Sequence, residues 1–496
     1  MTTVQYNFGA RVRSGMTWSV VNSLVLRLGN FAVGIVLARL LIPEQFGVFA
    51  VALTVQAVLM TLADLGMSAD LIRSDNHKEK APTVATLGAV SGIAATAALA
   101  ASAQTIADAL GSGPAGPVIA VLSLSLMLAG LGVVPFASLQ REFEQKKLFI
   151  IAVIEFATST TVTIGLVLAG WGAMGLAAGR IIAQVMTLIL QFVMAGQSPK
   201  FGFSRSIAPT ILQFGIPVAG ANLLSWALLN IDNVAISSMA GPVTLGFYYL
   251  AFNISNWPMS ALGQVVRSIS LPAFSRMDSN SAGKSLTPVV GPVWALSLLG
   301  GVLLAALSSP IIELVYGRQW LPAAPVLSWL GIFGALRALF DLAASFLLAQ
   351  GAAKATLVVQ VAWIAALAPV MFFAVHTAGS VGAAAAHLAI CLFIVVPAYA
   401  IAIKGNSADL KAVASQLWPP LAAAAVAAGT ILAVTAVVVS PLAALVLGTV
   451  VGAGVYALLL RTWFAARLQY IAGAFAGTAQ PTQTHTDVHP QSGGER

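Results

Sequence analysis

Charged side chains interrupt several of the longest apolar stretches of this sequence. They comprise five arginines and four carboxylates, namely Arg27, Arg39, Arg180, Arg267, Arg337, Asp64, Glu155, Asp232 and Asp341. A charge at the centre of a membrane helix costs about 2.5–3.5 kcal/mol on insertion scales, so such residues usually face a bundle interior or an aqueous cavity and have a function. A guanidinium binds phosphate oxygens bidentately and keeps its charge when desolvated. This slightly cationic set therefore predicts a cavity for a phosphate or pyrophosphate group.

We assign the charged residues to two candidate roles. The substrate-binding candidates, for phosphate or sugar, are Arg27, Arg39, Arg180, Arg267, Arg337 and Asp232. The candidates for binding a coupling ion are Asp64, Glu155 and Asp341. Arg27 is the strongest arginine candidate, because it lies near the middle of its apolar stretch, where a long side chain reaches the interface least easily.

Plainer structural interpretations stay open for the other charges. Arg39 and Arg267 lie nearer helix ends and can extend to the interface. Arg337 and Asp341 are four residues apart and can form an ion pair within one helix. The remaining two carboxylates also have alternatives: Glu155 is a proton carrier or the counter-ion of a neighbouring arginine, and Asp232, with Asn230 and Asn233, forms a patch for sugar hydroxyls or a packed helix junction.

The elements that must position these side chains are membrane helices. The chain has 496 residues, of which 59% are hydrophobic and 8% are charged. An average soluble domain is only about 45–50% apolar. Apolar stretches of about 20 residues recur along the chain, each long enough to cross a hydrocarbon core of about 30 Å. We predict an all-α integral membrane protein of about fourteen transmembrane helices, by this length criterion.

The distribution of basic residues favours a membrane topology over nucleic-acid binding. The net charge is +8, but lysine and arginine are spread over many short loops instead of one face. With a cytoplasmic N-terminus they fall mostly in the inner loops, and the outer loops hold little beyond Arg318. The positive-inside rule then predicts an even number of spans, with both termini in the cytoplasm.

The sequence contains no complete motif for enzyme chemistry, metal binding or cofactor binding. The single Cys391 lies in an apolar span, which predicts a small buried residue and neither a disulfide nor a thiolate metal site. "SAGKS" at 281–285 ends like a phosphate-binding loop, but Asp278 stands where that motif needs glycine. The longest outer loops, 108–117 and 309–322, leave little room for an external catalytic site. We therefore expect no enzyme activity, no metal and no cofactor.

Two sequence echoes indicate an internal repeat. "PEQFGVFAVA" at 43–52 resembles "PVTLGFYYLA" at 242–251, and "GAMGLAAGR" at 172–180 resembles "GSVGAAAAH" at 379–387. Because the two offsets are nearly equal, we expect two parallel six-helix lobes, an arrangement common in transporters. The predicted organisation is a cytoplasmic N-terminus (1–15), a first lobe (16–205), a second lobe (206–405), two further spans (406–464) and a disordered cytoplasmic tail (465–496).

Several longer stretches carry a family resemblance. "LARLLIPEQFGVFAVA" at 37–52, "LADLGMSADLIR" at 62–73, "LQREFEQKKLF" at 139–149 and "IDNVAISSMAGPVTLGFYYLA" at 231–251 are similar to the polysaccharide transporter family. That family comprises Wzx-type flippases of lipid-linked oligosaccharides, relatives of the lipid II flippase and of multidrug MATE exporters. Within it, the chain looks most like exporters of acidic exopolysaccharide of the succinoglycan type.

The resemblance implies a function and a location. Two six-helix lobes would surround a cavity and carry oligosaccharide repeat units, linked to undecaprenyl pyrophosphate, across the bacterial inner membrane. Alternating access would be driven by an ion gradient or the membrane potential. Arginines in such cavities are thought to hold the pyrophosphate, and Arg27 is best placed to match, with Arg39, Arg180 and Arg267 less certain. The bilayer, a polysaccharide polymerase and chain-length or export proteins are the expected partners, and nucleic acid is not.

Two other classes of protein remain as alternatives. A MATE-like antiporter of small cations or drugs would share the fold, although its cavity would favour acidic and aromatic groups. A membrane enzyme of polysaccharide assembly, such as a polymerase, would share the pathway. For Arg39 itself two interpretations stay open: it guides an anionic head group at the outward exit, or it fixes the first turn at the interface together with Glu44.

Overall fold

The computed structural model describes residues 25–64, 66–74, 76–275, 279–406 and 409–477. Within these ranges the regular structure is helical and contains no β-strand. A first helix occupies residues 25–40. The others are α2 (Pro43–Asp64), α3 (Met67–Arg73), α4 (His77–Ala109), α5 (Ala115–Arg141), α6 (Gln145–Leu168), α7 (Gly172–Ala195), α8 (Ala208–Ser275), α9 (Ser279–Ala306), α10 (Ser308–Val315), the 3₁₀ turn η1 (Arg318–Ala323), α11 (Ala324–Ala349), α12 (Ala353–Ile390), the π-helical η2 (Cys391–Val395), α13 (Val396–Gly405), α14 (Leu410–Val437) and α15 (Pro441–Gly477).

The predicted all-α, multi-pass membrane fold is confirmed. Eleven helical stretches of the described chain are long and apolar enough to cross a bilayer. Helices suit a lipid bilayer because each helix satisfies its backbone hydrogen bonds within its own segment. Two of the long helices are not continuous: α8 is broken at Gly241 (φ 79°, ψ 175°) and α12 at Ala378 and Gly379 (φ 54°, ψ −136°). Glycine adopts these positive φ angles at little cost, so each break reverses the chain between two helical segments.

The structure differs from the sequence expectation at three places. The stretch 309–322, expected as an outer loop, is largely helical as α10 and η1. The short helix α3 follows α2, where no separate element was predicted. Helix α15 continues to Gly477, past residue 465, where we expected the tail to begin. Residues 1–24 and 478–496 lie outside the described residues.

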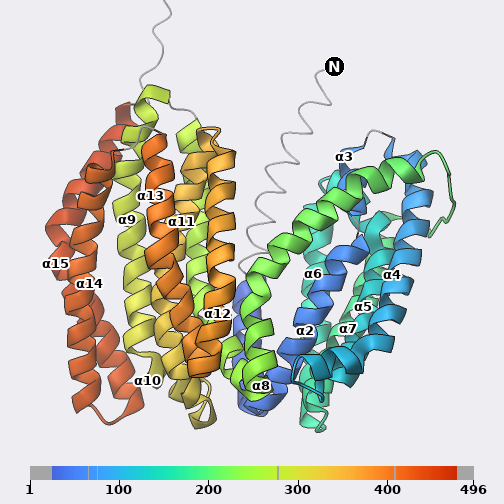
Figure 1. The fold of residues 1–496 in the computed structure, drawn as a ribbon, viewed down its shortest axis with the longest axis horizontal. Helices are drawn as coiled ribbons and strands as arrows, with labels where there is room; N and C mark the ends of the chain where they lie inside the picture. The colour runs from blue at the N-terminus through green and yellow to red at the C-terminus, as the bar shows by residue number, and fades with distance from the viewer. Residues whose placement is uncertain (1–24, 65, 75, 276–278, 407–408, 478–496) are drawn as a thin grey trace, which may run out of the picture.

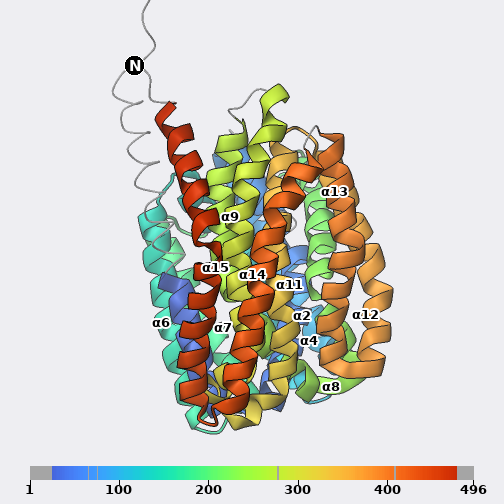
Figure 2. The same cartoon turned by 90° about the vertical axis from the view of Figure 1, so that its left-hand side faces the viewer.

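The helices form two bundles that converge at one end (Figure 1). One bundle holds α2 to α7, and the other holds α9 to α15. Helix α8 joins them, because it packs against α2 as well as against α11 and α12. The ribbons diverge toward the end marked N in Figure 1. Helices α14 and α15 lie on the flank of the second bundle, away from the first (Figures 1 and 2).

The same close helix crossing occurs once in each bundle. In the first bundle, a β-carbon added at Gly88 of α4 would lie 2.6 Å from the carbonyl oxygen of Gly130 in α5. In the second, a β-carbon at Gly301 of α9 would lie 2.8 Å from the carbonyl oxygen of Gly331 in α11. Small residues at such crossings let helix backbones approach closely within a membrane.

Candidate functional site

The two bundles meet through the first pair of sequence echoes. The backbone of Gly47 in α2 lies against Pro242, and the backbone of Gly246 in α8 lies against Pro43. A β-carbon at either glycine would overlap the carbonyl oxygen of the facing proline. The contact is thus reciprocal, with equivalent residues of the two echoes exchanged. We call this end of the molecule, with the turns at Pro43 and Gly241 and with α10 and η1, the closed end.

Arg39 joins the bundles at the closed end. Its Nε donates to the carbonyl oxygen of Val315 at 2.9 Å, and its NH2 group donates to that of Leu314. These are the last carbonyls of α10, which have no partner within the helix and lie at the negative end of its dipole. Arg39 therefore has a structural role in this conformation, as a cap that links the first helix to the second bundle.

Trp320 of η1 is the apolar centre of the closed end. Its side chain is completely buried, and its indole Nε1 donates to the carbonyl oxygen of Ala38 at 2.7 Å. Its ring makes edge contacts with Phe46 of the first bundle (5.2 Å between centroids) and with Phe247 of α8 (6.1 Å). Buried aromatic anchors of this kind carry most of the energy of an interface.

A polar face of α7 lines a pocket in the first bundle. Arg180, Gln184, Thr187 and Gln191 follow the i, i+4, i+7, i+11 spacing of one helix face. The last three line a pocket of about 310 Å³ together with Glu155 of α6. The Oε1 of Gln184 is buried there without a hydrogen-bond partner. Amide and carboxylate groups in a half-apolar pocket suit sugar hydroxyls.

Arg180 of α7 lies near both α6 and α8. It is exposed, and it lies within electrostatic reach of Glu155 in its own bundle and of Tyr249 in α8. Glu155 interacts electrostatically with this arginine, and both roles left open for Glu155 stay predictions. The proximity does not remove its capacity to bind a proton.

The second bundle contains a separate polar pocket of about 190 Å³. It is lined by the predicted residues Asp232, Arg337 and Asp341, with His387 and Tyr399 among others. Asp232 is 3% exposed and accepts a hydrogen bond from the hydroxyl of Tyr248 at 2.6 Å. Arg337 donates to Oδ1 of Asn256 in α8 at 3.1 Å.

The polar residues at 230–233 face two different bundles. Asn233 donates to Oδ1 of Asn230 and to Oγ1 of Thr54 in α2, both at 3.3 Å, so the asparagines face the first bundle. Asp232 itself faces the interior of the second bundle. The patch is therefore a helix junction on one side and part of a pocket on the other.

The remaining candidates are placed less fully. Arg27 is partly buried in the first helix, two residues before Gly29, which packs directly against Phe156 of α6. The side chains of Asp64 and Arg267 lie outside the described part of the structure. The structure thus groups the described candidates into a first-bundle site with Arg180 and Glu155, a second-bundle site with Asp232, Arg337 and Asp341, and the closed end with Arg39.

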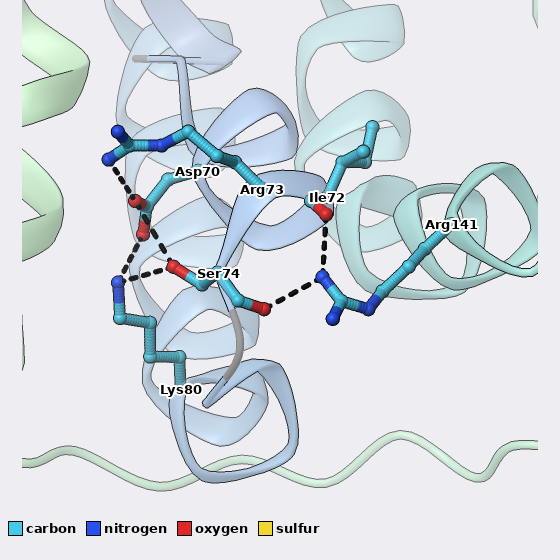
Figure 3. A network of polar contacts seen from close by, with 6 residues as sticks. All are labelled: Asp70, Ile72, Arg73, Ser74, Lys80 and Arg141. Carbon is cyan, nitrogen blue, oxygen red and sulfur yellow. Dashed lines mark hydrogen bonds and ion pairs between the residues drawn. The ribbon is translucent and has the colours of Figure 1, made fainter. Parts of the chain in front are cut away.

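A third cluster joins two of the stretches that carry the family resemblance (Figure 3). Asp70 of α3 is almost fully buried and accepts from Nζ of Lys80 at 2.8 Å. Ser74 accepts from the same Nζ at 2.7 Å. Arg141 at the end of α5 donates to the carbonyl oxygens of Ile72 (2.6 Å) and Ser74 (2.7 Å). The cluster therefore fixes α3 against α4 and α5.

We expect Asp70→Ala to be strongly destabilising. It leaves the ammonium of Lys80 without its carboxylate, and removing one partner of a buried ion pair typically costs about 3–5 kcal/mol. The measurement is the thermal unfolding temperature of the purified protein in detergent. Lys147→Ala is the matched control, because it removes an ion pair with Glu144 between partly exposed side chains, worth about 0–1 kcal/mol. Equal unfolding temperatures for the two variants would contradict the structural role of Asp70.

Sequence analysis missed several residues of these sites. Gln184, Thr187 and Gln191 were detectable from their spacing with Arg180 on one face of an otherwise apolar helix. His387 appeared only as the last residue of a sequence echo. Tyr248 appeared only as an aromatic position shared by the first pair of echoes. Trp320 gave no signal, because an aromatic residue in an apolar stretch is ordinary until its partners are known.

Comparison with known proteins identifies the family. Residues 36–325 match the family described as "Polysaccharide biosynthesis protein". The chain belongs to this family. It is 26% identical over 405 residues to the lipopolysaccharide biosynthesis protein WzxC of Escherichia coli K12, covering 79% of this chain and 80% of that one. It is 26% identical over 327 residues to the succinoglycan biosynthesis transport protein ExoT of Rhizobium meliloti, covering 65% and 66%.

Solved structures share the fold of this family member. The lipid II flippase MurJ, in an inward closed conformation, superposes with a TM-score of 0.74 at 14% identity, over 91% of this chain and all of that one. An inward-facing MATE multidrug transporter superposes with a TM-score of 0.60 at 16% identity, over 77% and 95%. The chain is thus a multi-pass membrane protein of the polysaccharide biosynthesis family with a MurJ-like and MATE-like fold.

Proposed function

We propose that this protein is a flippase that moves oligosaccharide repeat units, linked to undecaprenyl pyrophosphate, across the bacterial inner membrane for exopolysaccharide synthesis. The observation that carries the proposal is the match of more than half the chain to a polysaccharide biosynthesis family, combined with a transporter fold. Relatives named for transport and for lipopolysaccharide or succinoglycan support it further. A polymerase and export proteins would act on the product.

The proposed topology has fourteen spans in two six-helix lobes with two additional C-terminal helices. The breaks at Gly241 and Gly379 divide α8 and α12 into two spans each. The reciprocal contact of Gly47 and Gly246, and the repeated glycine crossings, support a duplication. With both termini in the cytoplasm by the positive-inside rule, the closed end faces outward.

The proposed transport cycle alternates this conformation with one that is open outward. In the conformation described here the contacts of Arg39, Trp320 and the two glycines hold the outer end together. The pyrophosphate would bind arginines between the lobes, and Arg180 and Arg27 are the proposed binding residues. The sugars would contact the polar face of α7. Reversal of the outer contacts would then release the lipid-linked unit.

Arg180→Ala is expected to abolish translocation while leaving the protein folded. Truncating one partner of a charge pair that becomes desolvated on binding typically costs about 2–5 kcal/mol of binding. Arg180 is exposed in the conformation described here, so little packing is lost. The measurement is translocation of lipid-linked oligosaccharide by purified protein in liposomes. Arg205→Ala is the control, since it removes an exposed arginine that lines neither pocket. Wild-type rates for Arg180→Ala would remove it from the substrate site.

The same liposomes test the alternative of a cation antiporter. Export of a small organic cation by protein that leaves lipid-linked oligosaccharide in place would overturn the flippase proposal. The fold alone is compatible with either substrate, because a MATE transporter also shares it. The family match favours the polysaccharide pathway.

A further inference from the structure

The pocket of the second bundle contains buried polar atoms that lack partners. His387 is 6% exposed, and neither ring nitrogen makes a hydrogen bond; the indole Nε1 of Trp363, which lines the same pocket, is also buried without one. Nε2 of His387 lies 3.4 Å from Oδ2 of Asp232, an ion-pair distance without hydrogen-bond geometry. Buried polar groups are almost always satisfied, so this cluster indicates a polar species that enters the pocket.

The charges around the pocket favour a proton over a metal cation. The lining includes the carboxylates of Asp232 and Asp341 but a single guanidinium, that of Arg337. One added positive charge balances them, and an imidazole is the side chain that gains a charge between pH 5 and 8. In the described part of the chain, no group of three or more His, Cys, Asp or Glu side chains could hold a metal ion.

Aromatic and charged side chains surround His387 in this pocket. The imidazole ring stacks on the ring of Phe333, with 4.7 Å between the two centroids. The guanidinium carbon of Arg337 lies 5.8 Å from the centroid of the Phe333 ring. The titratable and charged groups that line the pocket of His387, or that interact with this lining, are Asp232 and Tyr248 of α8, Arg337 and Asp341 of α11, Cys391 of η2 and Tyr399 of α13. The carboxylate of Asp232 lies at an ion-pair distance from Nε2 of His387.

The two lobes carry different side chains at equivalent positions of the sequence echo. The echo of 172–180 with 379–387 places His387 at the position of Arg180. A permanently charged arginine is therefore exposed at this position in one lobe, and a buried histidine occupies the same position in the other. The π-helical segment η2 begins four residues after His387, and π-helical turns occur frequently at functional sites.

The same carboxylate connects this pocket to the closed end. Asp232 precedes the break at Gly241 and Tyr248 follows it, so their 2.6 Å hydrogen bond joins the two segments of α8. The turn between those segments carries Pro242, which lies against Gly47. Protonation of His387 would convert its neighbour Asp232 into an ion-pair partner and change how firmly α8 is held to α12.

We propose that His387 and Asp232 form a proton-binding site in the second bundle, and that protons entering and leaving it drive the closed end open and shut. In each cycle an aqueous proton from the outer face binds a ring nitrogen and leaves on the cytoplasmic face. The inference rests on the proposed function, which makes this proton the driving ion of translocation.

The test uses full-length protein in sodium-free liposomes that carry lipid-linked oligosaccharide and a pH-sensitive dye. With an imposed pH gradient, wild-type protein is expected to translocate oligosaccharide and to carry protons into the more alkaline compartment. His387→Asn is expected to lose the proton flow and to translocate no faster with the gradient than without it. His376→Asn is the matched control, because this histidine lies on the same helix but is exposed.

Two outcomes overturn the proton site, and both differ from failure of the flippase. Gradient-driven translocation by His387→Asn at the wild-type rate would do so. So would wild-type translocation that is driven by a sodium gradient, imposed in a second set of liposomes, and not by the pH gradient. If wild-type protein moves no oligosaccharide at all, the proposed function fails, and proton binding is read independently by histidine NMR. The site requires an imidazole signal, absent from His387→Asn and His387→Arg, that changes as the pH is changed; a flat signal would contradict it.

Discussion

Replacement of Gly47 by valine is expected to abolish translocation and to leave the protein open at its outer end. The valine side chain would overlap the carbonyl oxygen of Pro242, and a backbone atom cannot move aside as a flexible side chain can. Overpacking typically costs about 1–3 kcal/mol, and each 1.4 kcal/mol changes a conformational ratio about tenfold. Since the clash exists only when the bundles meet, the cost falls selectively on the closed conformation.

Thiol labelling measures this shift directly. Thr54 is buried between the bundles, where it accepts from Asn233, so a Thr54→Cys reporter should be protected from an impermeant maleimide added outside. We expect Gly47→Val to make the reporter accessible, whereas the native Cys391 is buried. Gly34→Ala is the control, because a β-carbon there meets nothing within 4 Å. If the reporter stays protected and translocation stays normal in Gly47→Val, the contacts of the closed end do not open during transport.

Truncation of Trp320 to alanine is the second change with a large expected effect. The ring is completely buried between Phe46 and Phe247, and loss of a buried tryptophan side chain typically costs about 3–5 kcal/mol. We expect the same reporter at Thr54 to become accessible and translocation to fall. Trp320→Phe keeps most of the apolar contact and loses the hydrogen bond to Ala38, which is worth about 1 kcal/mol, so its effect should be smaller.

Trp329 provides a matched control for the tryptophan series. It lies on the neighbouring helix α11 but is 42% exposed, so Trp329→Ala removes an equally large side chain without opening the contact between the bundles. Equal accessibility of the reporter in Trp329→Ala and Trp320→Ala would show that the effect is general loosening of the second bundle.

The fold was largely predictable because a bilayer imposes a simple constraint on the sequence. Long apolar stretches that cross a bilayer as single segments must be helices, so an all-α, multi-pass fold follows from the pattern of hydropathy along the sequence. The short helices α10 and η1 were not predictable in this way. They are stabilised by tertiary contacts, such as the burial of Trp320 and the capping of α10 by Arg39, which composition does not reveal.

The candidate sites were predictable in part, and the reason differs from residue to residue. Asp232, Arg337 and Asp341 could be singled out because charge in an apolar stretch is costly, and they do line one pocket. Arg39 satisfied the same criterion but caps carbonyls of another bundle, a partner 275 residues away in sequence. His387 and Gln184 are polar but carry no permanent charge, so only their neighbours in space distinguish them from other polar residues.

The location of the lipid-linked repeat units in living cells tests the flippase function most directly. In a strain that lacks this protein, complete lipid-linked units should accumulate on the cytoplasmic face of the inner membrane, and the intact gene should restore their movement outward. Arg27→Ala and Arg180→Ala, produced in normal amounts, should fail to restore it. If complete units reach the outer face without this protein, it is not the flippase.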